Sequence, residues 1–154
     1  MSVLEAMGAW VQSTGAGTLG TDLFLARMPD RPDACLTLYE YDGGQPIEVL
    51  GTTGIAVNRV RMQFSGRSER DDYPTVRDLM LDLRGSISSM VGTVVAGEYI
   101  LRARPMGYLN QLGYDDENRW RVTFNVEVLY DPNYVAPATA GFGLQPFGVT
   151  SFGG

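Results

Sequence analysis

The sequence contains no histidine and only one cysteine, Cys35, among its 154 residues. Because histidine is the usual proton shuttle of enzymes near neutral pH, acid–base catalysis is poorly supported. Zinc and most transition metals are bound through histidine or several cysteines, which leaves only a hard cation held by carboxylates, and the sequence has no EF-hand spacing. We therefore expect no catalytic residue, no metal site and no cofactor.

A single cysteine cannot form an internal disulfide, and Cys35 lies in the apolar run CLTLYEY. We expect a buried thiol in a protein that matures in a reducing compartment. The N-terminal segment has an acid, Glu5, and no basic residue, which is not the pattern of a signal peptide. No run approaches the roughly 18 apolar residues of a membrane span. The sequence predicts a soluble chain, made in the cytoplasm, that has no membrane partner.

Basic residues are outnumbered, with 12 Lys and Arg against 18 Asp and Glu, and the formal net charge is −6. A chain whose main task is to hold duplex phosphates needs a basic stripe across the whole domain, so any contact with nucleic acid must be local. The length and the apolar content of 44% suit one globular domain with its own core.

Apolar residues recur with two different periods along the chain. Spacings of three and four residues predict two helices, from Val3 to Val11 and from Tyr73 to about Val91, while alternation predicts strands. The predicted strands are Thr21–Met28, Cys35–Tyr41, Val57–Gly66, Glu98–Met106 and Trp120–Tyr130. This order predicts an α+β fold, in which an antiparallel-rich β-sheet has two helices packed on one face.

The C-terminal residues differ in composition from the rest, because Asp131 is the last charged residue and glycine, proline and phenylalanine recur after it. We expect a domain over residues 1–131 and an extended arm over residues 132–154. Such an arm cannot fold on itself, so we expect a neighbouring surface to hold it, with Phe142, Phe147 and Phe152 as anchors. Disorder and packing against its own domain are the alternatives.

Arginines fall on the side of the predicted strands that is opposite to the apolar side. Six of the 12 basic residues would then share the sheet face that the helices leave open. These residues are Arg59, Arg61, Arg102, Arg104, Arg119 and Arg121. The alternative is a solvated outer face, on which the aliphatic stems of the arginines cover the sheet.

Acidic residues gather in two turn-like segments, which contain Glu69, Asp71, Asp72 and Asp115, Asp116, Glu117. Polar turns keep carboxylates solvated and do not raise their pKa, so these residues are poor candidates for catalysis. They are better candidates for partner loops, because the planar guanidinium group of arginine binds a carboxylate bidentately.

Five segments, in this order, resemble one known family: GTLGTDLFLARMPDRPD, YDGGQPIEVLG, VNRVRMQFSGRS, YPTVRDLML and RPMGYLNQLGYDDENRWRVTFNVEV. They are similar to the minor capsid or tail terminator (tail completion) proteins of long-tailed bacteriophages. The resemblance runs from about Leu4 to Tyr130 and leaves the arm unmatched. It implies no catalytic residues.

The resemblance implies a structural protein of the virion, present in the host cytoplasm during assembly. Such a protein forms a six-subunit ring on the head-proximal end of the tail tube, ends tube polymerisation and joins the tail to the neck or connector. Its partners would be other copies of itself, the tube protein and the neck protein, with DNA passing through the lumen without sequence-specific binding. A neighbouring neck or minor capsid protein is the alternative within phages.

The arginines have three interpretations, and the first two follow from this resemblance. They can pair with the acidic loops of an adjacent subunit or of the tube protein, which is the hypothesis we favour. They can instead face DNA in the lumen, where salt-sensitive phosphate contacts would dominate. A third alternative is a non-viral binding module that uses the arginine face for a small acidic ligand or a peptide.

Overall fold

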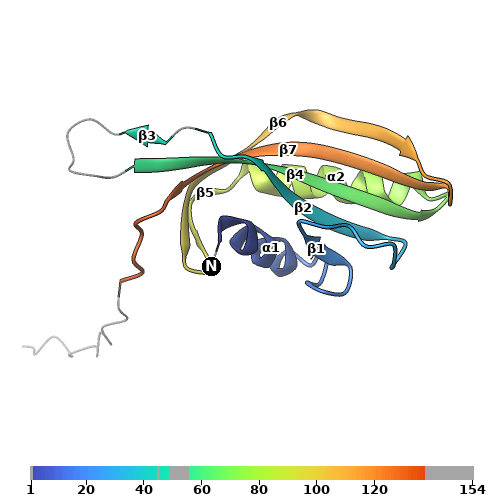
Figure 1. Ribbon diagram of the computed structural model, residues 1–154, viewed down its shortest axis with the longest axis horizontal. Helices are drawn as coiled ribbons and strands as arrows, with labels where there is room; N and C mark the ends of the chain where they lie inside the picture. The colour runs from blue at the N-terminus through green and yellow to red at the C-terminus, as the bar shows by residue number, and fades with distance from the viewer. Residues whose placement is uncertain (1, 45, 49–55, 138–154) are drawn as a thin grey trace, which may run out of the picture.

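The computed structural model describes residues 2–44, 46–48 and 56–137 and shows one curled sheet with two helices (Figure 1). The strand order is β1-β2-β4-β7-β6-β5, with β3 paired to β4. The strands are β1 (Leu23–Leu25), β2 (Cys35–Asp42), β3 (Ile47–Glu48), β4 (Ala56–Arg70), β5 (Val91–Val95), β6 (Glu98–Tyr114) and β7 (Arg119–Asp131). Among these strands, all pairings are antiparallel except β1–β2.

Helix α1 (Val3–Ser13) begins at a capping box, in which the Ser2 hydroxyl accepts from the Glu5 amide and the Glu5 carboxylate accepts from the Ser2 amide. The helix is followed by Gly15 in the left-handed region, with φ of 81°. Helix α2 (Tyr73–Ser88) begins after Asp72, whose carboxylate caps the Thr75 amide, and Pro74 occupies its first turn. Both helix starts therefore follow from local side-chain chemistry.

The core lies between the helices and one side of the sheet. Alternation turns Val60, Met62 and Phe64 of β4 and the matching apolar residues of β7 toward the helices, and all of them are buried. Phe64 and Phe124 stack at a centroid distance of 5.1 Å in the middle of this layer. Both helices contribute to the same core cluster, so the prediction of an α+β fold with two helices on one face is confirmed (Figure 1).

The close approach of α2 to the sheet depends on Gly66 of β4. A Cβ atom at that position would lie 2.8 Å from Val76 Cγ2 and 2.9 Å from Met80 Sδ. Both side chains point from α2 into the core and are buried. The absence of a side chain at residue 66 therefore sets the distance between this helix and the strand beneath it.

The strands differ from the predicted ones in several places, and β4 continues to Arg70, beyond the predicted end at Gly66. The first strand is shorter than Thr21–Met28, because the chain takes a positive φ of 62° at Ala26. The strand predicted to end at Met106 continues to Tyr114, through irregularities in its register with β7. The short strands β3 and β5 were not predicted. No helix in the described part of the chain is long and apolar enough to span a membrane.

Candidate assembly surface

The side of the sheet that faces away from the helices, here called the outer face, carries most of the arginines of the strands. Register places Arg59 level with Arg102, through Leu129, and Arg61 level with Arg104, through Glu127. All basic residues of the chain are arginines. Since arginine cannot lose its proton at ordinary pH, the charge on this face is permanent.

Glu127 is the centre of a cluster with three arginines, here called the Glu127 cluster. The carboxylate oxygens of Glu127 lie 3.6 Å from Arg59 Nε, 3.8 Å from Arg61 Nε and 3.2 Å from Arg104 Nη2. The side chain of Glu127 is 12% exposed, whereas that of Arg104 is 57% exposed. One carboxylate thus neutralises part of the charge of three guanidinium groups and leaves the cluster positive.

Charge alternates along one row across the sheet, here called the charge row. Register aligns Asp42 of β2, Arg61 of β4, Glu127 of β7 and Arg104 of β6. Within the row Asp42 Oδ2 accepts a hydrogen bond from Arg61 Nη1 at 3.0 Å. Opposite charges at neighbouring cross-strand positions stabilise a sheet by roughly 0.2–1 kcal/mol a pair. The row ends with an acid on β2 and with an arginine on β6.

Arg102 lies next to the charge row but outside its ion pairs. It is exposed and, with Arg104, Glu127 and Leu129, lines a hollow of about 100 Å³ on the outer face. The side chain of Arg102 forms no ion pair or hydrogen bond with any residue of the described ranges. Its charge is therefore available to a partner.

Arg119 differs from the other predicted arginines, because its side chain is only 10% exposed and is bound within its own chain. Its Nε donates to Asp115 Oδ2 at 2.8 Å, and its Nη1 donates to the Asp30 carbonyl oxygen at 2.8 Å and to Asp33 Oδ1 at 3.1 Å. The contact with Asp115 raises the pKa of Arg119. These contacts give Arg119 a structural role at the β6–β7 turn.

Arg67 of β4 lies at the same end of the outer face and was not among the predicted site residues. Its Nε donates to the Asp33 carbonyl oxygen at 2.8 Å, and its Nη2 donates to those of Asp30 and Pro32 at 3.1 and 2.6 Å. Arg67 and Arg119 together fix the segment between β1 and β2. The alternation of β4, continued beyond Gly66, places Arg67 on the arginine side of the strand and could have identified it. Its acceptors could not be predicted in this way, because these backbone carbonyls are far away in the sequence.

Arg121 is level with Arg67, and both line a hollow together with Ala26, Arg27 and Tyr39, among others. Its Nε is buried and has no hydrogen-bond partner among the described residues. The six predicted arginines thus form two groups, with Arg59, Arg61, Arg102 and Arg104 at one end and Arg119 and Arg121 at the other.

The predicted acidic residues are used in two ways. Asp115 and Glu117 pair with Arg119, and Asp72 caps α2. Burial acts to raise the pKa of Asp115, but hydrogen bonds from Arg119 and from the Glu117 amide prevail and lower it to about 2. The remaining acidic residues of the two turns, Glu69, Asp71 and Asp116, are exposed.

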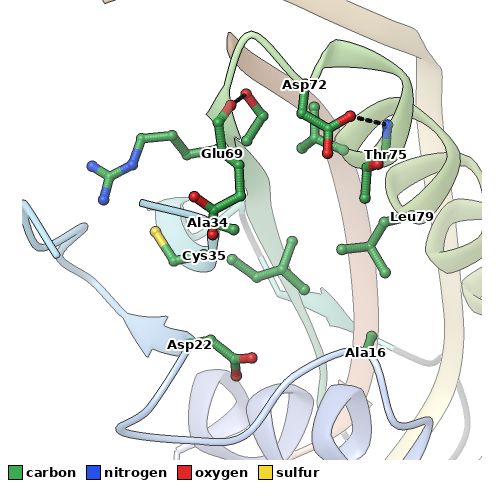
Figure 2. A pocket seen from close by; sticks show the side chains of 12 residues that line it. Ala16, Asp22, Ala34, Cys35, Glu69, Asp72, Thr75 and Leu79 are labelled. Carbon is green, nitrogen blue, oxygen red and sulfur yellow. Dashed lines mark hydrogen bonds between the residues drawn. The ribbon is translucent and has the colours of Figure 1, made fainter. Parts of the chain in front are cut away.

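A pocket of about 100 Å³ lies beside the start of α2. Figure 2 shows Asp22 and Asp72 on opposite sides of it, with Leu79 and Cys35 also on its walls (Figure 2). Cys35 is free and buried, as expected, and burial raises the pKa of its thiol, so the thiol is protonated at neutral pH. Within the described ranges no group of three or more His, Cys, Asp or Glu residues is arranged to hold a metal ion.

The phenylalanines of the arm cannot be placed, because Phe142, Phe147 and Phe152 lie outside the described residues.

Comparison with known proteins agrees with the family suggested by the sequence. A family model described as "Bacteriophage tail terminator protein" matches residues 10–132, which run from α1 to just beyond β7. Among solved structures, a chain of the "Virion of native gene transfer agent (GTA) particle" is 11% identical, with a TM-score of 0.49 over 73% of this chain and 80% of that chain. No curated protein matches the sequence. Because the family model covers most of the chain, the protein belongs to the bacteriophage tail terminator family and has a structural role in a phage tail.

Proposed function

We propose that the protein forms a homo-hexameric ring on the head-proximal end of the tail tube, ends tube polymerisation and provides the surface to which the neck binds. The observation that carries this proposal is the family match over residues 10–132. The outer face supports it, since its arginines lie on an open sheet surface that suits a protein partner.

The Glu127 cluster and Arg102 form the assembly surface in this proposal, with carboxylates of a neighbouring subunit or of the tube protein as their partners. Arg102 and Arg104 are the exposed members without full compensation. The carboxylates of Glu69, Asp71 and Asp116 are exposed and form no ion pair or hydrogen bond within the described part of the chain, so they are available as acceptors. Arg119, Asp115 and Glu117 act as supports of the fold.

DNA passes through the lumen of the ring without sequence-specific contacts in this proposal. The formal net charge of −6 supports weak contact with phosphates, because a chain of that charge repels DNA over most of its surface. The arm, residues 132–154, binds a neighbouring copy through its phenylalanines.

Tail assembly without this protein tests the terminator role. In cells that produce the particle, deletion of the gene should give tubes of variable, excessive length that do not join heads, and the wild-type gene should restore one length. Electron microscopy measures the length distribution. A strain that lacks the protein and still makes tails of one normal length, joined to heads, would rule out the proposed role.

A further inference from the structure

Besides the outer sides of the terminal strands β1 and β5, two stretches of sheet edge lack a strand partner within the described part of the chain. Strand β5 pairs with β6 only over Glu98–Arg102, so the edge from Arg104 to Tyr114 has no strand partner, and within it the Gly107 carbonyl accepts from Arg84 of α2 at 3.1 and 2.6 Å. At the opposite side of the sheet β1 pairs with β2 only over Leu36–Leu38, so the edge from Glu40 to Asp42 is open. Figure 1 shows β6 continuing well beyond β5 (Figure 1). Open edges offer free backbone donors and acceptors to another strand.

The two open edges carry opposite charges. The β6 edge begins at the exposed Arg104, close to the exposed Arg102, whose backbone pairs with Val91 of β5. The β2 edge has the exposed Glu40 and Asp42, whose side chain is 44% exposed. The side chain of Glu40 makes no ion pair or hydrogen bond with a residue of the described ranges. The charge row connects these edges, because it begins at Asp42 and ends at Arg104.

The strand directions fit pairing between two copies. Three successive antiparallel pairings, β2–β4, β4–β7 and β7–β6, make β2 antiparallel to β6 within the chain. Rotation about a ring axis preserves strand directions relative to that axis. When β6 of one copy lies beside β2 of the next, the two strands are therefore antiparallel, which is the geometry for an antiparallel ladder.

We propose that the ring closes through this contact, in which the β6 edge of each copy pairs with the β2 edge of the next copy. This inference rests on the proposed ring. Arg104 then lies beside Asp42 of the neighbouring copy, and the alternation of the charge row continues from one subunit to the next. Each copy uses each edge once, which is the heterologous arrangement that a closed ring requires.

The β6 edge also has the apolar surface that such a contact needs. No charged residue occurs between Arg104 and Asp115, and Tyr108, Leu112 and Tyr114 are 59, 56 and 64% exposed. On the β2 edge Tyr41 is 50% exposed. Natural proteins usually protect an open edge with charges or by covering it, so an uncharged edge with exposed aromatic side chains indicates a surface that is buried in an assembly.

Charge exchange between the two edges tests the proposal. Variant one carries Arg102→Glu and Arg104→Glu, so that both of its edges are acidic, and variant two carries Glu40→Arg and Asp42→Arg, so that both are basic. In native mass spectrometry the wild-type protein should form the ring. Each variant alone should form the ring only at a concentration more than about tenfold higher than the wild type needs, because like charges then face each other. An equimolar mixture should recover a ring with alternating variants.

Recovery in the mixture is the decisive readout, because Asp42 and Arg104 also contact Arg61 and Glu127 within the chain. Mixing cannot repair a damaged fold. It does place an acidic edge of one variant beside a basic edge of the other, which restores the charge match. A control variant with Arg77→Glu and Asp78→Arg exchanges charges on α2, away from both edges, and should keep the ring.

Three results would overturn the edge contact: a ring in either variant at the wild-type concentration, no recovery in a mixture of variants that unfold cooperatively like the wild type, or a wild-type chain that is monomeric at all concentrations. The terminator role is judged separately by tail length in producing cells. If tails lose length control without the protein and the variants still form rings, the proposed function is supported and this interface is rejected.

Discussion

Arg119 Nε donates a hydrogen bond to the Asp115 carboxylate at 2.8 Å, across the turn that connects β6 to β7. Because the Arg119 side chain is 10% exposed and also binds the segment before β2, Arg119→Met should lower the free energy of unfolding by about 2 kcal/mol. Urea unfolding measures this change. Arg121→Met, on the same strand and face but without an ion pair, is the matched control, and equal losses in the two variants would contradict the structural role of Arg119.

The Asp115 contact should make stability depend on pH in the acid range. The folded state lowers the pKa of Asp115 from 3.8 to about 2, so its contribution is fully present above the higher value and is lost as the pH falls through the lower one. Asp115→Asn should therefore be less stable than wild type near neutral pH, and the two should converge toward acid pH. Thermal unfolding across this range measures the difference, and a difference that stays constant would contradict the linkage.

Glu127→Gln should destabilise the chain by about 1 kcal/mol, because three arginines then repel one another without a central carboxylate. Added salt screens that repulsion, so the loss should shrink at high ionic strength. Chemical unfolding in urea at two salt concentrations measures both effects. Asp78→Asn, at a side chain that is 72% exposed, is the control and should have little effect. A Glu127→Gln loss that is independent of salt would argue against the electrostatic explanation.

Two glycine-to-alanine substitutions should have opposite signs. Gly66→Ala places a Cβ atom against the stiff Val76 side chain and should cost about 1–3 kcal/mol. Gly85→Ala lies within α2 and has nothing within 4 Å of the new atom, so it should stabilise the helix by about 0.5–1 kcal/mol. Thermal or urea unfolding of the two variants measures both. Destabilisation by Gly85→Ala would mean that the helix needs its glycine for another reason.

A chain that ends at Asp131 lacks the arm and should associate more weakly than the full chain, if the arm binds a neighbouring copy. Sedimentation velocity over a range of concentrations measures the association. The full chain with serine at Phe142, Phe147 and Phe152 should reproduce the loss, because it removes the anchors and keeps the length. Unchanged sedimentation of both variants would assign the arm to a partner other than this protein.

The sequence predicts those parts of the fold that have a strong local signal. Strand β7 and helix α2 show a clear period, and their apolar sides are the buried ones in the structure. Strand β5 has no such signal, because most of its residues are exposed and no alternation results. The extension of β6 was missed because Gly107 and Gly113 have positive φ and interrupt the alternation with irregular register.

The site was predictable as a set of residue types but not as an arrangement. Alternation placed arginines on one side of each strand, yet the neighbour of a given arginine depends on which strands pair and in which register. Glu127 became the centre of a cluster only through its alignment with Arg61 and Arg104. The internal use of Arg119 arises from a carbonyl at Asp30, a long-range contact that no local pattern reveals.

Because Arg67 and Arg119 bind the segment between β1 and β2, the electrostatic potential of the outer face differs between its two ends. At one end the guanidinium groups of Arg67 and Arg119 are satisfied by carbonyls and carboxylates, while at the end near Arg102, about 26 Å away along the strands, positive charge is uncompensated. A ring of identical copies would inherit this gradient along its axis. Its two rims would then have unlike potentials, so the subunit itself would define which rim meets the tube and which meets the neck.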